Sequence, residues 1–342
     1  MDRFAIPLTP HPAAPLRSAA TLSRWERVGS SDTTSEQPTA NSEQRFDRKK
    51  RMSTWIASQY GSAMPRPAPS RANQRHRYLL GDSRREAARL RAQAELWDPV
   101  AHALFDRVAV KEGWRVLEVG PGQGSLHVEL RRRVRCPTDA VEPSPLFARR
   151  LRSLCRRDRF GLGNIHEIPL AKAELPRDEY DFIFARWVFL FLAEAEKHLR
   201  ILVQALKPGG VLALQDYHRE TFTLVPRPAE WVNFVESDRR FFATQGADAS
   251  IGSRLPTLFT RAGLKVTDVT PTIKCGAPGS GTWRWLTDYF FSVMERYATI
   301  RPFTPKQAQR LSAQWREAER SSTSLLIAPA VLDVVGRKPR TP

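Results

Sequence analysis

Short apolar runs alternate with segments of helical period between residues 116 and 216. The pattern predicts strands at 116–119, 138–142, 164–168, 181–185 and 210–216, with helices at 126–134, 146–154 and 194–206 between them. A short apolar run bounded by turn residues is typical of a buried strand, whereas apolar residues three and four positions apart share one helical face. Strands and helices that alternate in this way predict βαβ units, and hence a mainly parallel sheet with helices on both faces.

A further helical pattern precedes this region. Apolar residues recur at steps of four and three between Leu90 and Leu104, which is the spacing of one helical face. The pattern predicts a helix that starts after Asp82 or Ser83. Pro99 is expected to open a second helix, because proline suits the first turn of a helix and disrupts its interior.

The first 77 residues have a different composition. They contain eight of the 26 prolines and show no lasting period of either kind. Such a segment is expected to be disordered. Translation that starts at Met52 or Met64 is an alternative, and it would make the extension spurious. We therefore divide the chain into this extension, 1–77, and one folded domain at 78–338.

Composition limits the classes of protein that remain. Hydrophobic residues make up 41% of the chain, which excludes wholesale disorder. No run approaches the length of a membrane span and no apolar signal segment is present, so we expect a cytoplasmic protein. The three cysteines are far apart and the histidines do not cluster, so neither a disulfide scaffold nor a metal site is predicted. The net charge of +18 leaves nucleic acid open as a partner.

A glycine-rich segment follows the first predicted strand and leads into the next helix. Its sequence is Val116-Leu-Glu118-Val-Gly120-Pro-Gly122-Gln-Gly124-Ser. Glycines at such a place allow a tight turn and the close approach of a ligand. The spacing G-x-G-x-G differs from the G-x-G-x-x-G of dinucleotide sites, and the phosphate-binding G-x-x-x-x-G-K-[ST] is absent. This spacing argues against a nicotinamide oxidoreductase.

Glu142 ends the second predicted strand, 22 residues after Gly120. A carboxylate there can accept hydrogen bonds from both hydroxyls of a ribose. It can instead cap the following helix, beside Ser144 and Pro145. With a glycine-rich loop at this distance, we interpret Glu142 as a ribose-binding residue.

Four landmarks together resemble the class I S-adenosylmethionine-dependent methyltransferases. They are, in order, the loop Glu118–Gly124, Glu142, the segment Tyr180–Trp187 and the segment Leu206–Leu214. The resemblance is specific over 114–216 and looser over about 78–338. It implies an enzyme that uses S-adenosyl-L-methionine.

The resemblance also implies the topology. The fold class is α/β, with a Rossmann-like seven-stranded sheet in the order 3-2-1-4-5-7-6 and strand 7 antiparallel. Leu264–Ile273 suits strand 6 and Leu325–Val335 suits strand 7. The segments 217–260 and 276–322 are then insertions, which we expect to form helical lids.

Positions that match the family's motifs are expected to contact the cofactor. They are Glu118, Gly120, Gly122, Gly124, Glu142, Pro143, Arg186 and Trp187. One departure is the lack of an acidic residue directly after strand 3, where many members bind the adenine amino group. Glu167, Glu174 or a backbone group could take that role.

Candidate catalytic residues lie just past the fifth strand. The sulfonium carbon is already electrophilic, so the protein mainly has to orient the acceptor and exclude water. A general base is needed only where the acceptor carries a proton of high pKa. Asp216 and His218 are the candidates, with Tyr217 between them. The alternatives are a helix cap or loop acid for Asp216 and a surface histidine for His218.

The segment after strand 4 bears on the acceptor. The loop and Glu142 also resemble the ribosomal RNA adenine dimethyltransferases, which carry an Asn-Leu-Pro-Tyr type motif there. This chain has Ala185-Arg186-Trp187-Val188 instead, which argues against methylation of an exocyclic base nitrogen. The chain is more similar to the ubiquinone/menaquinone-biosynthesis type, and the aromatic-rich insertions suit a small, largely apolar or aromatic acceptor.

Other functions stay open at this point. Ten arginines lie between Arg131 and Arg159 and would serve an RNA or protein methyltransferase, although a solvated helical face explains them as well. A catalytically silent cofactor-binding protein is a third reading. The sequence predicts neither the acceptor atom nor the oligomeric state.

Overall fold

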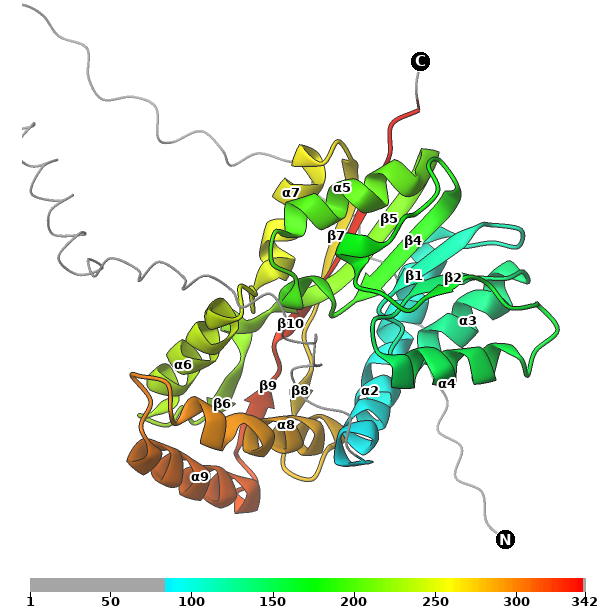
Figure 1. Ribbon diagram of the computed structural model, residues 1–342. Coiled ribbons are helices and arrows are strands. Elements are labelled where there is room, and N and C mark those ends of the chain that lie inside the picture. The colour runs from blue at the N-terminus through cyan, green and yellow to red at the C-terminus, as the bar shows by residue number, and fades with distance from the viewer. Residues whose placement is uncertain (1–83, 341–342) are drawn as a thin grey trace, which may run out of the picture. The chain divides into compact units, whose positions relative to one another are not determined.

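The computed structural model describes residues 84–340, so the predicted extension at 1–77 lies outside the described residues. A seven-stranded sheet carries helices on both faces, and a smaller sheet lies with a group of helices at one of its ends (Figure 1). No helix in this range is both long and apolar enough to cross a membrane.

The large sheet has the strand order β3-β2-β1-β4-β5-β10-β7. Its strands are β1 (Val116–Val119), β2 (Asp139–Val141), β3 (Ile165–His166), β4 (Tyr180–Arg186), β5 (Leu206–His218), β7 (Lys265–Thr272) and β10 (Ala330–Arg337). Strand β10 is antiparallel to β5 and β7, and the pairs from β3 to β5 are parallel. The predicted Rossmann-like fold is confirmed, with β7 and β10 as the sixth and seventh strands of the expected order.

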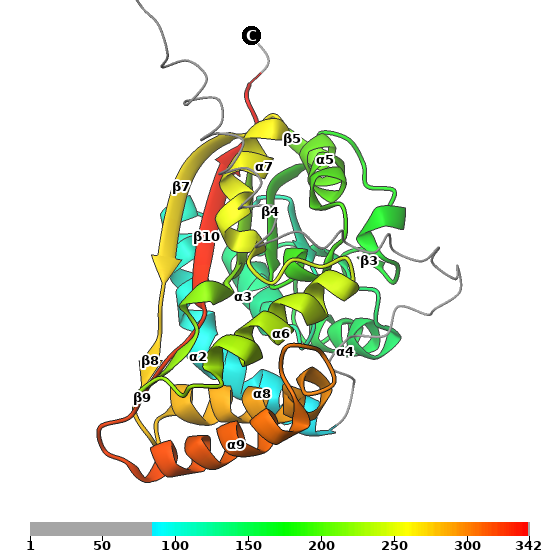
Figure 2. The same cartoon turned by 90° about the vertical axis from the view of Figure 1, so that its left-hand side faces the viewer.

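Two hydrophobic cores lie on the two faces of this sheet. Along β4, Phe182 and Phe184 belong to one core and Ile183 and Ala185 to the other, as the alternation of side chains in a strand requires. Helices α2 (Arg84–Val108) and α3 (Ser125–Val134) cover the first face, and α5 (Ala195–Ala205) and α7 (Leu255–Arg261) cover the second (Figure 2). Helix α4 (Pro145–Cys155) packs beside β2 and β3.

Helix α2 is continuous through Pro99, so the predicted start of a second helix there is wrong. A proline inside a helix costs about 3 kcal/mol. Trp97, Ala101 and Leu104 are all fully buried and lie on both sides of the proline. Their burial holds one uninterrupted stripe against the sheet, and this outweighs the hydrogen bond that Pro99 cannot make.

The insertions form a second layer of structure. They contain α6 (Trp231–Thr244), α8 (Gly281–Tyr297) and α9 (Pro305–Arg320). A small sheet at their ends has β6 (Thr223–Val225), β9 (Leu325–Ile327) and β8 (Cys275–Gly276) in that order. Short 3₁₀ helices are η1 (Leu170–Lys172), η2 (Phe189–Phe191), η3 (Arg219–Thr221) and η4 (Ile251–Arg254). The small sheet, which the sequence analysis missed, ties the segment after β5 to the segments after β7 and α9.

The single strand predicted at Leu325–Val335 is in fact two strands in two sheets. Strand β9 ends at Ile327, and β10 begins at Ala330. Between them, the Thr221 hydroxyl donates to the Ala328 carbonyl oxygen at 3.2 Å and accepts the Ala330 N–H at 2.7 Å. Pro329, which has no N–H to donate to a ladder, lies in this break.

Aromatic residues of the insertions pack mainly against one another. Phe234 lies 5.2 Å from Phe290 and 5.8 Å from Phe303 between ring centroids, and Trp315 stacks on Phe290 at 3.9 Å. All four side chains are fully buried. Most of the aromatic content of the insertions therefore forms their own core.

Candidate functional site

The predicted site residues lie at the carboxyl ends of β1, β2, β4 and β5 and in the loops that follow them. These ends meet at one edge of the sheet, where α/β proteins bind ligands. The insertions, with the small sheet, lie at this same end (Figure 1). The predicted site residues thus lie at the end of the sheet that carries the insertions.

The glycine-rich loop after β1 has three residues with positive φ. They are Gly120 at +68°, Gly122 at +52° and Gly124 at +85°. A Cβ on Gly120 would lie 2.5 Å from the Val188 side chain, so the fold itself requires that glycine. A Cβ on Gly122 would meet no atom within 4 Å. Open space at Gly122 marks the place on the loop where a ligand can approach the backbone.

Glu142 joins the end of β2 to this loop. One carboxylate oxygen accepts the Gly122 N–H at 3.0 Å, and the other accepts the Ser144 N–H at 2.9 Å. Burial raises the pKa of Glu142, although the Ser144 and Gly122 N–H groups favour its ionised form. The structure therefore brings together the two features that the sequence analysis combined into a ribose site.

Glu118 lies below the loop and pairs with a residue that the sequence analysis did not single out. Its carboxylate is 3.0 Å from Nδ1 of His127 on α3, and both side chains are buried. Burial disfavours protonation of His127, but hydrogen bonds to Cys155 and Glu118 raise its pKa to about 9. This contact fixes α3 against the end of β1.

Arg186 ends β4, Trp187 follows it, and both contact α2. Arg186 Nη2 donates to Asp98 at 2.6 Å, and its guanidinium lies 4.7 Å from the centre of the Trp187 ring. Trp187 has a φ of +53°, a strained conformation for a bulky residue. Its ring stacks on Tyr217 at 5.3 Å and meets the edge of Trp97 at 5.9 Å.

Three N–H groups in this cluster are buried with no hydrogen-bond partner among the described residues. They are Nη1 of Arg186 and Nε1 of both Trp187 and Trp97. An unpaired buried donor costs about 1–3 kcal/mol, so a group of three needs a reason. Trp97 and Asp98 were not predicted as site residues. Trp97 belongs to the apolar stripe of α2, so nothing in the sequence pattern distinguishes it from a core residue.

Asp216 and His218 lie at the end of β5 in different settings. Asp216 is buried, and its carboxylate accepts the N–H groups of Leu190 at 3.1 Å and Tyr217 at 3.0 Å. Burial raises its pKa to about 7, with the backbone N–H groups opposing the shift. His218 is half-buried and lies 3.9 Å from Glu220, and its buried Nδ1 atom has no hydrogen-bond partner within residues 84–340.

The remaining candidates lie near the third strand. Pro143 is exposed, as is Glu174, whereas Glu167 is paired with Arg152 at 2.8 Å. The structure does not place an unpaired carboxylate directly after β3. An adenine-binding role for Glu167 or Glu174 stays a prediction.

Residues 117–214 match the sequence family described as "Methyltransferase domain". This segment is a methyltransferase domain. The predictions of a methyltransferase enzyme and of S-adenosyl-L-methionine as its cofactor are confirmed at this level. No curated protein matches the chain by sequence.

Several solved structures have folds similar to that of this chain. The YcgJ protein of Bacillus subtilis is 16% identical, with 70% of this chain and 98% of that chain covered and a TM-score of 0.49. Phosphoethanolamine N-methyltransferase 2 of Haemonchus contortus is 14% identical, with 71% and 53% covered and a TM-score of 0.45. An S-adenosylmethionine-dependent methyltransferase of Mesorhizobium loti is 16% identical, with 66% and 92% covered and a TM-score of 0.40. The family match, rather than these similarities, identifies the domain.

Proposed function

We propose that this chain transfers a methyl group from S-adenosyl-L-methionine to a small, largely apolar or aromatic acceptor, in the manner of the ubiquinone/menaquinone-biosynthesis type. The observation that carries the proposal is the hydrogen bond from the Gly122 N–H to Glu142, at a place where no protein atom lies within 4 Å of a Cβ built on Gly122. Each Glu142 oxygen accepts one backbone N–H. A carboxylate oxygen has further lone pairs, so both can still accept hydrogen bonds from ribose hydroxyls.

The unpartnered donors fit the amino-acid end of the same cofactor. A carboxylate needs several N–H donors when it leaves water, and Arg186, Trp187 and Trp97 offer three that have no other partner. They belong to the end of β4 and to α2, which lie beside the glycine loop, as the contact of Val188 with Gly120 indicates. The residues present therefore suit both ends of the cofactor.

When bound, the cofactor supplies an electrophilic methyl group, so the residues have mainly to position the two reactants. Asp216 contributes to this by holding the backbone N–H groups of the turn after β4. That turn carries Trp187 and Val188, which contact Tyr217 and Gly120 respectively. We assign Asp216 a positioning role and keep His218, with its free Nδ1, as the candidate base.

The aromatic cluster supports the acceptor class. Trp97 contacts Trp187 and Trp285 with ring centroids 5.9 Å and 5.8 Å apart, and Trp187 stacks on Tyr217. Trp187 is only half-buried and lies at the end of β4. A flat apolar acceptor would bury its surface against such rings.

Transfer of labelled methyl groups tests the proposal. The purified chain and labelled S-adenosyl-L-methionine are incubated with a cell extract, which is then separated into small-molecule, RNA and protein fractions. We expect label in the organic-soluble small-molecule fraction, and a loss of that label in the His218→Ala variant if the acceptor must be deprotonated. Label confined to RNA or protein would contradict the proposed acceptor class.

A further inference from the structure

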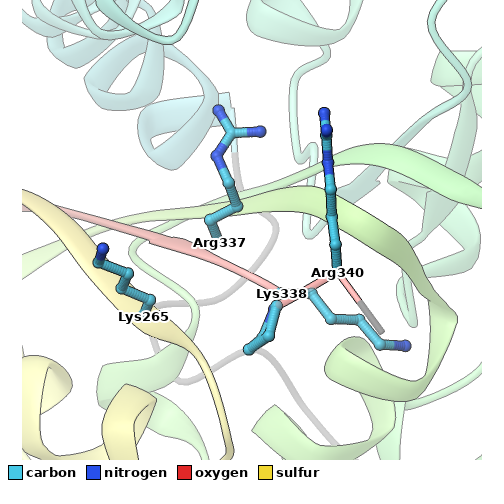
Figure 3. A pocket seen from close by; sticks show the side chains of 5 residues that line it. Lys265, Arg337, Lys338 and Arg340 are labelled. Carbon is cyan, nitrogen blue, oxygen red and sulfur yellow. The ribbon is translucent and has the colours of Figure 1, made fainter. Parts of the chain in front are cut away.

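Two adjoining cavities lie where the strands of the large sheet end on the side opposite the methyltransferase site. Their volumes are about 440 Å³ and about 300 Å³, and both are lined by Arg337 and Arg340. The larger is completed by Lys265, Lys338 and Pro339 (Figure 3). The smaller extends past Gly209 to Lys111 and Trp114. The site described above lies at the other end of the same strands, because Arg337 pairs with Val211 whereas Ala330 pairs with His218.

Cationic side chains follow this edge from strand to strand. Lys265 on β7 is directly opposite Arg337 on β10. Lys207 is the second residue of β5, and Lys111 and Trp114 precede β1. The row thus crosses the neighbouring strands β7, β10, β5, β4 and β1, a span of roughly 19 Å at the usual strand spacing.

Several of these charges have no carboxylate to neutralise them. Lys207 pairs with Asp181 and Lys338 with Asp178, each at 2.7 Å. Arg337 donates instead to the carbonyl oxygen of Gly209 at 2.6 Å. No described carboxylate lies within ion-pair distance of Lys111, Lys265, Arg337 or Arg340. We call these four residues the basic edge.

The arginine-rich stretch from Arg131 to Arg159 is different. Arg131 is fully buried and bonds Asp158, and Arg133 pairs with Asp106 and Glu129. Arg135 and Arg152 are also in ion pairs. Four of the ten arginines that first suggested RNA are therefore in ion pairs, whereas none of the four basic-edge residues pairs with a described carboxylate.

We propose that the basic edge binds a single-stranded nucleic acid through its phosphates. Figure 3 shows the side chains of Arg337 and Arg340 extending to the same side. Each guanidinium group can donate hydrogen bonds to a phosphate there. The length of the row suits a chain of phosphates rather than one free phosphate. Trp114 lines the smaller cavity, and an aromatic ring among cations is typical of single-strand binding. An acidic peptide would use the charges but not this ring.

This inference does not depend on the proposed acceptor. The basic edge and the Gly122–Glu142 site lie at opposite ends of the strands, so bound nucleic acid is a docking partner and does not enter the methyl-transfer site there. Binding to the basic edge is therefore expected with or without cofactor. Failure of one proposal leaves the other unaffected.

Fluorescence anisotropy of a short labelled oligouridine, titrated with the full chain over a range of salt concentrations, tests the inference. The variant Arg337→Glu/Arg340→Glu is compared with Arg156→Glu/Arg157→Glu, which changes the net charge equally at exposed residues of the arginine-rich stretch. We expect the first pair to weaken binding by about tenfold or more and to reduce the salt slope by about 1.4, since each single-strand phosphate contact contributes about 0.7. The control pair should stay within about threefold of the original chain. Because Arg337 lies in β10, Lys265→Glu/Arg340→Glu, which alters a β7 side chain instead, repeats the test if the first pair does not fold.

Three results would overturn the inference. One is equal weakening by both charge-reversed pairs, which would mean that only net charge matters. Another is displacement of the oligouridine by polyglutamate at an equal charge concentration, which would favour an acidic peptide. The third is no binding by the original chain at low salt.

Discussion

A methyl group added at Gly122 would enter the space that we assign to the cofactor. Gly122 has a φ of +52°, and its Cβ would meet no protein atom within 4 Å. The Gly122→Ala variant should therefore fold, with a loss of roughly 1–2 kcal/mol for an alanine in the left-handed conformation. Extra atoms in a well-fitted space cost about 1–3 kcal/mol. Affinity for S-adenosylhomocysteine should accordingly fall by roughly 5- to 150-fold.

Gly113→Ala is the matched control for this variant. Gly113 has a φ of +82° and open space at its Cβ, but it precedes β1 at the opposite edge of the sheet. It should lose similar stability and keep its affinity. Denaturant unfolding measures the stabilities, and isothermal titration calorimetry measures the affinities. If Gly122→Ala folds and binds S-adenosylhomocysteine as tightly as Gly113→Ala does, the space at Gly122 is not the cofactor site.

The other predictions concern two buried carboxylates. Burial raises the pKa of Asp216 to about 7, so its contribution to stability is complete below its unfolded value near 3.8 and is lost as the pH rises towards 7. Between these pH values the unfolding free energy of the original chain should therefore fall more steeply than that of Asp216→Asn, by up to about 1.4 kcal/mol per pH unit. Equal slopes for the two proteins in plots of unfolding free energy against pH would refute this. Asp238 accepts from Arg219 at 2.9 and 2.8 Å and from Tyr297 at 2.7 Å. Asp238→Asn should cost about 3–5 kcal/mol in urea unfolding because Arg219 stays buried without a counter-charge, whereas Glu236→Gln on the same helix should cost under about 1 kcal/mol. Equal losses in these two variants would contradict an ionic role for the buried pair.

The sheet was predictable because its strands carry local signals. Strand β1 was predicted with the observed bounds, because its short, mostly apolar sequence Val-Leu-Glu-Val leads directly into a glycine-rich turn. The helix predicted at 126–134 begins one residue later than α3, because the glycine-rich turn that ends at Gly124 marks where the helix starts. The full strand order came from the family resemblance. Local pattern alone does not fix which strands are neighbours.

Features that depend on tertiary contacts were not predictable. Pro99 ends a helix in isolation, but burial of Trp97 and Ala101 keeps α2 intact. The break between β9 and β10 depends on Thr221, about 107 residues away along the chain. In the same way, the sequence gives no sign that Asp216 accepts the N–H of Leu190.

The glycine loop and Glu142 were found because their spacing is local, but their partners were not. His127 pairs with Glu118 from the next helix, and Asp98 pairs with Arg186 over 88 residues. Neither residue stands out from its neighbours in a helical pattern. The roles assigned to all the predicted site residues stay predictions until binding is measured.

The affinity of Glu142→Ala for S-adenosylhomocysteine tests the central claim most directly. Calorimetry should show binding by the original chain and a Kd roughly 5- to 150-fold higher for the variant, which corresponds to about 1–3 kcal/mol of lost charged hydrogen bonds. Glu112→Gln, which removes an exposed carboxylate paired with Arg135 at the opposite end of the strands, should bind as the original chain does. An unchanged Kd in a folded Glu142→Ala variant, or no binding by the original chain, would contradict the claim that Glu142 and the glycine loop hold the cofactor.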